Sequence, residues 1–235
     1  NGYRTALIGK WHLGYLQKHH PMNFGFQKFV GFKSGNVDYQ SHRNRYGDVD
    51  WWDGLEMKNM PGYTTTLLTT LSEDYIKENK DKPFCLYIAN AAPHSPMQGP
   101  NEKAIRTEAT PEGDKNSDRP NKEIYKDMVE ELDWSVGRIL ETLKKYKLDK
   151  NTFVVFFSDN GPVINNGGST GGYRGAKGAP WEGGHRVPGI CYMPGIVKGG
   201  TMCKQTVMSF DLFPTMLDMA NIHYDDSKKK LDGAS

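Results

Sequence analysis

The feature that most constrains the fold is an uninterrupted run of β-branched and aromatic residues from Thr152 to Phe157. A strand with one face in water alternates apolar and polar residues, and this run does not alternate. A second apolar run extends from Phe84 to Ala89, directly after Pro83. We therefore expect two buried strands, with the segment Phe153–Phe157 at the centre of a sheet that is covered on both faces.

Strand and helix patterns alternate along the chain. Apolar residues recur at three- and four-residue spacing from Thr64 to Asn79 and from Ile124 to Leu143, which predicts two helices. Shorter patterns predict strands at Thr5–Ile8 and Gly189–Met193, a helix capped by Asp211 at Asp211–Ala220, and a loop-like region at 24–60. Strands that alternate with helices indicate an α/β fold, with a mixed, mainly parallel sheet and helices on both faces.

The composition excludes several classes of protein. Thirty Lys and Arg residues stand against 28 Asp and Glu residues, so the formal net charge is +2 and no basic excess favours nucleic acid. The apolar runs, including Phe153–Phe157, are far shorter than the roughly 20 residues of a membrane-spanning helix. The three cysteines include no C-x-x-C pair and suggest no disulfide framework, and we expect Cys85 and Cys191 to be buried in their apolar segments.

Polar residues follow three of the predicted strands. Lys10 and His12 follow the first strand, His94 follows the second, and Asp159 and Asn160 follow the third. In open α/β sheets, ligands bind at the carboxyl ends of the strands, so we expect these five side chains at one edge. Carboxylate and amide oxygens suit a hard divalent cation such as calcium.

Half of the 26 glycines lie between Gly161 and Gly200, in a segment that begins just after Asn160. The segment matches neither G-x-x-x-x-G-K-[ST] nor G-x-G-x-x-G, so it does not predict a nucleotide-binding loop. It carries four basic residues, Arg174, Lys177, His185 and Arg186. Cations beside a carboxylate-bound metal favour a site for a tetrahedral oxyanion.

Each of these features also has a purely structural interpretation. A Lys or a His after a strand is common in loops, and Asp159-Asn160-Gly161 is a turn sequence. The pair Trp51-Trp52 is either a platform for a sugar ring or the edge of the core. The hypothesis of a functional site rests on the joint occurrence of these features.

Five segments resemble blocks of the type I, formylglycine-dependent sulfatases, in the order that the family has them. They are Gly2–Gly14, Ala92–Pro96, Ser158–Gly161, Gly175–Gly184 and Leu231–Gly233. The first is similar over thirteen consecutive positions. The resemblance implies an arylsulfatase-like bacterial member with the fold of the alkaline phosphatase superfamily. Residues 1–235 would then be the sulfatase catalytic domain, lacking its N-terminal part and the C-terminal subdomain.

The resemblance also implies roles for individual residues. Lys10 would bind the sulfate and the oxygen of the nucleophile, and His12 would hydrogen-bond the nucleophile and act as a base. His94 and Lys177 would contact sulfate oxygens and assist the departing alcohol, and Ser34 would lie in the substrate site. These residue types suit a sulfate monoester, which needs charge neutralised on three equatorial oxygens and a proton for its leaving group.

One calcium ion and a formylglycine are the cofactors that the resemblance implies, with Asp159 and Asn160 as two of the calcium ligands. The family's two other metal aspartates and its C/S-x-P/A-x-R motif, whose Cys or Ser becomes formylglycine, do not occur in this sequence. In the family both precede the Gly2–Gly14 block, so we expect them upstream of Asn1. The isolated chain is then expected to be inactive and to bind calcium weakly.

The expected function is hydrolysis of sulfate monoesters, with sulfated carbohydrate as the substrate class and a periplasmic or extracellular location. A formylglycine-generating or sulfatase-maturing enzyme is an expected partner. Two alternatives stay open. One is a phosphodiesterase or phosphonate hydrolase of the same superfamily, which normally carries more His and Asp metal ligands. The other is a catalytically inactive protein that binds sulfated glycans, and the residue at the nucleophile position distinguishes it from an enzyme.

Overall fold

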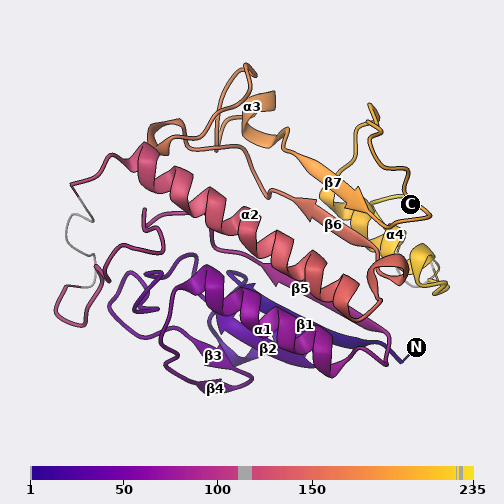
Figure 1. Cartoon of the computed structure of the whole chain (residues 1–235), viewed down its shortest axis with the longest axis horizontal. Helices are drawn as coiled ribbons and strands as arrows, with labels where there is room; N and C mark the ends of the chain where they lie inside the picture. The colour runs from indigo at the N-terminus through magenta and orange to yellow at the C-terminus, as the bar shows by residue number, and fades with distance from the viewer. Residues whose placement is uncertain (1, 111–117, 226, 228–229) are drawn as a thin grey trace. The chain divides into compact units, whose positions relative to one another are not determined.

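Three parallel strands form one side of a five-stranded mixed sheet with the order β4-β3-β2-β1-β5 (Figure 1). The computed structural model describes residues 2–110, 118–225, 227 and 230–235. Strand β1 (Arg4–Lys10) pairs in parallel with β2 (Lys28–Phe32) and with β5 (Phe84–Ala89). The short strands β3 (Trp52–Asp53) and β4 (Glu56–Met57) continue the sheet in antiparallel pairs.

Two glycines hold the parallel strands close together at their carboxyl ends. The register places Gly9 opposite both Gly31 and Ala89. A Cβ atom on Gly9 would lie 2.1 Å from the carbonyl oxygen of Ala89, and one on Gly31 would lie 2.1 Å from that of Gly9. Both glycines also have positive φ, +126° and +146°, which L-residues rarely adopt. Only glycine therefore fits this row, which immediately precedes Lys10.

The loop-like interpretation of residues 24–60 was wrong in one respect, because β2 lies within this segment. Phe29, Val30 and Phe32 of β2 are all buried. The strand is short, begins with a lysine and contains a glycine, so its sequence has neither the length nor the alternation that indicates a strand. Pairing with β1 on one side and β3 on the other is what makes it a strand.

Two long helices match the apolar periodicity of the sequence, α1 (Thr64–Glu78) and α2 (Asn121–Lys145). They pack against each other, and α1 also contacts β1 and β5. The hydroxyl of Thr69 in α1 donates to that of Ser135 in α2 at 2.6 Å, which pairs two buried polar groups. The α/β fold with a mixed sheet that the sequence predicts is thereby confirmed.

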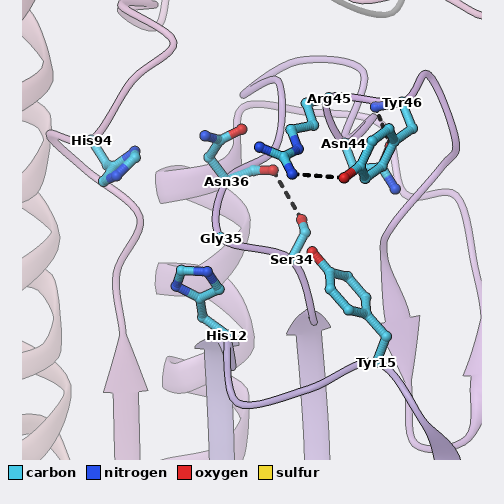
Figure 2. A pocket seen from close by; sticks show the side chains of 9 residues that line it. All are labelled: His12, Tyr15, Ser34, Gly35, Asn36, Asn44, Arg45, Tyr46 and His94. Atoms are coloured by element: carbon cyan, nitrogen blue, oxygen red, sulfur yellow. Dashed lines mark hydrogen bonds between the residues drawn. The ribbon is translucent and has the colours of Figure 1, made fainter.

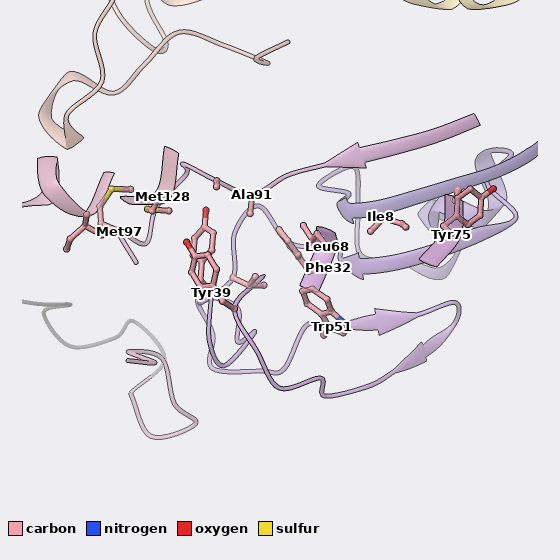
Figure 3. Packing of buried hydrophobic residues seen from close by; sticks show 14 residues of the cluster. Ile8, Phe32, Tyr39, Trp51, Leu68, Tyr75, Ala91, Met97 and Met128 are labelled. Carbon is pink, nitrogen blue, oxygen red and sulfur yellow. The ribbon is translucent and has the colours of Figure 1, made fainter. Parts of the chain in front are cut away.

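The core lies between the sheet, α1, α2 and the segment that connects β2 to α1 (Figure 3). Its largest fully buried side chains include Trp51, Tyr39 and Phe32. Tyr39 stacks on Tyr63 with ring centroids 5.4 Å apart. Of the two tryptophans at 51 and 52, Trp51 is thus a core residue, whereas Trp52 is only partly buried.

Shorter helices connect these elements. In the larger of the two compact units into which the chain divides, they are η1 (Gln17–His19), η2 (Pro21–Phe24), η4 (Ile164–Asn166) and α3 (Glu182–His185). By compactness the chain divides into two units, of which the larger comprises residues 2–148 and 157–189. The smaller comprises 149–156 and 190–235 and contains η3 (Asp149–Asn151), η5 (Ser209–Asp211) and α4 (Leu212–Met219). In the described part of the chain, no helix has the length and apolarity needed to span a membrane.

The apolar strand that the sequence predicts at Phe153–Phe157 is not at the centre of a sheet in this chain. Strand β6 (Val154–Phe157) pairs with β7 (Gly189–Tyr192), and among the described residues these two strands form a sheet of their own. Phe156 is 36% exposed and Phe157 38% exposed. An apolar run shows that a strand can be covered on both faces, but long-range contacts decide whether it is.

Two smaller predictions also fail. Cys85 and Cys191 are exposed, because their strands present these positions on faces that nothing in the described chain covers. Asp211 precedes α4 but does not cap it. Its carboxylate accepts instead from the backbone N–H groups of Met208, at 2.7 Å, and Ala234, at 3.0 Å.

Candidate active site

The carboxyl ends of β1, β2 and β5 bring three of the predicted site residues to one cavity (Figure 2). His12 follows β1, Ser34 follows β2 and His94 follows β5. Because the three strands are parallel, their ends lie at the same edge of the sheet. The cavity has a volume of about 240 Å³, and we call it the His12 cavity. The predicted convergence of His12 and His94 is confirmed.

The backbone at the end of β1 turns His12 towards this cavity. The N–H groups of Trp11 and His12 donate to the carbonyls of Phe32, at 2.9 Å, and Lys33, at 3.2 Å, so the chain beyond β1 still runs alongside the chain beyond β2. His12 has a φ of 56°, a left-handed conformation that is uncommon for a non-glycine residue. A Cβ atom on Gly35 would lie 2.5 Å from Nε2 of His12. The imidazole therefore occupies space that the missing side chain of Gly35 leaves open.

Replacing Gly35 by alanine should displace the His12 ring, because the added methyl group overlaps the imidazole. We expect the ¹H and ¹⁵N signals of His12 to shift strongly while those of the buried His20 stay in place. Overpacking of this kind costs about 1–3 kcal/mol of folding free energy. Gly137→Ala on α2 is the matched control, because a Cβ atom there meets nothing within 4 Å. Unchanged His12 signals in Gly35→Ala would contradict this packing.

The glycine-rich segment folds back on itself and positions Lys177. The N–H of Gly161 donates to the carbonyl of Gly184 at 2.8 Å, and the N–H of Lys177 donates to that of Pro162 at 3.0 Å. A Cβ atom on Gly161 would lie 1.9 Å from the carbonyl oxygen of Gly183. Gly161, Gly183 and Gly184 are therefore needed for packing, since neighbouring turns of backbone touch there without side chains between them. The hydrogen bond to Pro162 holds the backbone of Lys177 close to the segment that directly follows Asp159 and Asn160.

Charged side chains near the carboxyl ends of β1 and β5 shift the pKa values of Lys10 and His12. Burial lowers the pKa of Lys10, nearby Asp159 raises it, and nearby Lys177 lowers it again. The pKa of His12 is also lowered, first by burial and then by the positive charges of Lys10 and Lys177. Lys10, His12, Asp159 and Lys177 therefore lie within electrostatic reach, although 167 positions separate the first from the last.

His94 belongs to the same electrostatic cluster. Burial lowers its pKa, the hydrogen bond to the carbonyl of Ser95 raises it, and Lys10 and Lys177 lower it while Asp159 raises it. Its Nδ1 lies 2.9 Å from that carbonyl oxygen, which fixes the ring and leaves Nε2 as the second functional nitrogen. Because the net shift is downward for both His12 and His94, both imidazoles stay neutral to lower pH than an ordinary histidine.

Asp159 and Asn160 offer oxygen donors of the kind that calcium binds. Asp159 is exposed and Asn160 is partly buried, with its amide donating to the carbonyl of Gly161 at 3.1 Å. The two side chains have at most three oxygens, whereas calcium takes six to eight. Within the residues that the structure describes, no group of three or more His, Cys, Asp or Glu side chains could hold a metal ion. The pair fits part of a calcium site and does not complete one.

Ser34 lies in the wall of the His12 cavity and is held by its neighbours. Its N–H donates to Asp50 Oδ2 at 2.8 Å, and its hydroxyl donates to the carbonyl of Asn36 at 2.9 Å. Asp50 is buried and also accepts from the N–H of Lys33, at 3.1 Å, and from the indole of Trp52, at 2.7 Å. This carboxylate therefore fixes the backbone that carries Ser34.

Part of the His12 cavity comes from residues that the sequence interpretation did not single out: Tyr15, Asn36, Asn44, Arg45 and Tyr46. The available signal was the density of aromatic and polar residues between 24 and 60, which was interpreted as a loop. None of the four basic residues of the glycine-rich segment, Lys177 included, is among the residues that line the His12 cavity. Arg174 lies over the ring of Trp181 at 3.7 Å, Arg186 pairs with Glu182 at 2.8 Å, and His185 ends α3.

Comparison with known proteins decides the family. The family model described as Sulfatase matches residues 1–222. The chain is a member of the sulfatase family. The sulfatase family that the Gly2–Gly14 block and the four later segments imply is thereby confirmed, although Leu231–Gly233 lies outside the matched residues, and so is the alkaline-phosphatase-like sulfatase fold.

Two curated relatives of this chain are named as sulfatases. It is 33% identical to mouse arylsulfatase J over 99% of this chain and 39% of that protein. It is also 33% identical to dog N-acetylgalactosamine-6-sulfatase, over 94% of this chain and 43% of the relative. The chain thus spans less than half the length of these two curated relatives.

Solved structures agree with the assignment. The crystal structure of Ps i-CgsB in complex with k-i-k-neocarrahexaose has a TM-score of 0.84 and 29% identity, and it covers all of this sulfatase chain and 54% of its own. PsFucS1 sulfatase from Pseudoalteromonas sp. has a TM-score of 0.71 and 25% identity over 94% of this chain and 48% of its own.

Proposed function

We propose that the protein containing this chain hydrolyses sulfate monoesters of carbohydrates and that Lys10, His12, His94 and Lys177 carry out the chemistry. The observation that supports the proposal most directly is the electrostatic cluster at the strand ends. Lys10, Lys177, two imidazoles and the carboxylate of Asp159 lie within electrostatic reach of one another, and the two imidazoles line a cavity whose described lining contains no carboxylate. Such a site favours an anionic ester over an uncharged one.

The two lysines neutralise the sulfate. The ammonium groups of Lys10 and Lys177 stabilise negative charge on the equatorial oxygens as the ester bond breaks. Lys10 is half-buried, and in such a setting its charge acts through a lower effective dielectric constant than in water. Ser34, with its backbone held by Asp50, lies where the substrate enters.

The two imidazoles handle protons. His94, whose Nδ1 is held by the carbonyl of Ser95, presents Nε2 for a proton that passes to the departing alcohol, and Lys177 assists. His12 would hydrogen-bond the hydroxyl of the nucleophile and accept its proton, acting as a base. The lowered pKa of both groups keeps His12 in its basic form at neutral pH. Proton donation by His94 requires its imidazolium form, in which Nε2 also carries a proton, and the negative charge of a bound sulfate favours that form.

Two groups would act with these residues. A formylglycine, installed by a maturation enzyme, would supply the nucleophile, and a calcium ion would neutralise charge on it and on the sulfate. Asp159 and Asn160 are the residues of this chain that would bind the calcium, and their carboxylate and amide oxygens suit that ion.

Sulfated carbohydrate is the substrate class that we propose. One structural neighbour was solved with a neocarrahexaose, and another was solved in complex with D-glucosamine-2-N,6-O-disulfate. The polar lining of the His12 cavity, with hydroxyl and amide groups from Ser34, Asn36 and Asn44, also suits a sugar better than an apolar alcohol.

The proposal is tested by titrating the chain with p-nitrophenyl sulfate and following the histidine signals by NMR. We expect the signals of His12 and His94 to shift together, and Lys177→Met to weaken binding by roughly tenfold, the effect of one charge-assisted contact. Lys77→Met is the control, because Lys77 lies in the last turn of α1, which leads to the opposite end of β5. Titration to saturation without a shift of either imidazole would contradict the proposed function.

A further inference from the structure

The His12 cavity has a larger neighbour. A second cavity of about 570 Å³ shares Tyr15, Asn44 and Tyr46 with it and extends to Trp52, and we call it the Trp52 cavity. The shared residues place the two cavities next to each other. A ligand seated in the His12 cavity can therefore extend into the Trp52 cavity without leaving the protein surface.

The two cavities differ in charge. The described lining of the His12 cavity contains Arg45 and two imidazoles but no carboxylate. The lining of the Trp52 cavity contains three carboxylates, those of Asp48, Asp50 and Glu108, against two cations. The first cavity favours an anion, whereas the second disfavours one.

Both cations of the Trp52 cavity are engaged by the protein. The ammonium of Lys33 lies 3.4 Å from the ring centroid of Trp52 and donates to the carbonyl of Tyr15 at 3.4 Å. The guanidinium of Arg43 donates to the carbonyl of Gly47. Lys33 is also buried, so an anion that reached it would have to lose its water. Burial and these contacts disfavour an anion at Lys33, while Arg43 has one donor held by the backbone.

The acceptors of the Trp52 cavity are more accessible. Asp50 already accepts three N–H groups, but Asp48 and Glu108 are exposed. Carboxylate oxygens accept hydrogen bonds from hydroxyl groups. Tyr15 and Tyr46 are 55% and 61% exposed, and such rings offer apolar surface for the C–H face of a sugar.

We propose that the Trp52 cavity binds an uncharged sugar adjacent to the sulfated sugar. The inference rests on the proposed function and specifies its substrate: an oligosaccharide in which the sulfated unit in the His12 cavity is followed by a unit without sulfate or carboxylate. Hydroxyl groups of that unit donate to Asp48 and Glu108, and its ring lies against Tyr15 and Tyr46. An anionic substituent on the same unit is repelled by the carboxylates.

The test compares three ligands that share one sulfated sugar: the monosaccharide sulfate, a disaccharide with an uncharged neighbour, and the same disaccharide with a second sulfate on the neighbour. Binding is followed by NMR at two reporters, the imidazoles of His12 and His94 for the first cavity and the indole N–H of Trp52 for the second. We expect the uncharged neighbour to improve affinity over the monosaccharide and to shift both reporters. We expect the second sulfate to weaken affinity by about tenfold.

Charge reversal provides a matched set of variants. In the double variant Asp48→Lys, Glu108→Lys the preference should reverse, so that the disaccharide with two sulfates binds more tightly than the one with an uncharged neighbour. Asp74→Lys, at an exposed position on α1, changes the net charge in the same direction and should leave the preference as it is. A reversal in Asp74→Lys as well would show a general charge effect and overturn the proposal.

Each outcome at the reporters is decisive. Shifts at His12 and His94 without a shift at Trp52 would overturn the inference and leave the proposed function standing. A shift at Trp52 alone would contradict the proposed function, while the Trp52 cavity would remain a sugar site. Tighter binding of the ligand with two sulfates by the unmodified chain would show an anion site and overturn the inference. If none of the signals of His12, His94 and Trp52 shifts, both proposals are contradicted.

Discussion

Replacing Asp38 by alanine should lower the free energy of unfolding by about 3–5 kcal/mol, the range for breaking a buried charged network. The carboxylate is fully buried and accepts five hydrogen bonds. The donors are the backbone N–H groups of Gln40, Ser41, Ile105 and Arg106 and the side-chain amide of Gln98. Truncation leaves these donors buried without an acceptor, and each such group is costly. Burial alone would raise the pKa of Asp38, but these backbone donors lower it below its ordinary value.

Urea denaturation of the two proteins measures this effect. Asp133→Ala, at an exposed position on α2, is the control and should change stability by no more than about 0.5 kcal/mol. Asp38→Asn keeps the shape but sets an amide N–H₂ group against backbone donors, so it should also be strongly destabilising. A loss below about 1 kcal/mol in Asp38→Ala would show that water replaces the carboxylate, contrary to its complete burial.

Acidification from pH 6.5 to pH 4 should destabilise the fold by up to about 3 kcal/mol through His42. Its ring is fully buried and packs on Trp51 with centroids 4.3 Å apart, and burial lowers its pKa to about 4. In the unfolded chain the imidazole binds a proton near pH 6.5, whereas the folded chain does not bind one until about pH 4. The folded state thus loses stability as the pH falls through this window, and the loss levels off below it.

The measurement is the free energy of unfolding at several pH values between 4 and 7. His42→Asn removes the titrating group, and asparagine tolerates the left-handed conformation at this position, where φ is 55°. We expect the slope between pH 6.5 and pH 4 to flatten in this variant. His223→Asn, at an exposed position, should retain the slope. An equal slope in all three proteins would assign the acid sensitivity to other groups.

Local sequence determined the regular elements and the chemistry at their ends. The periodicity of α1 and α2 and the apolar run of β5 predict these elements closely, because each pattern follows from one face or one strand that must leave water. The positions of His12 and His94 just beyond β1 and β5 follow from the same reasoning, since parallel strands end at one edge. The family resemblance also follows from local blocks of sequence.

Tertiary structure alone decided which segments become neighbours. Strand β2 exists because β1 and β3 pair with it, and β6 pairs with β7 although its sequence suits the centre of a larger sheet. Most of the residues that line the His12 and Trp52 cavities come from the chain between β2 and α1, which has no periodic pattern. Burial and pairing depend on contacts between residues far apart in the chain. A local pattern states what a segment can bury, and only the folded chain supplies the partner that buries it.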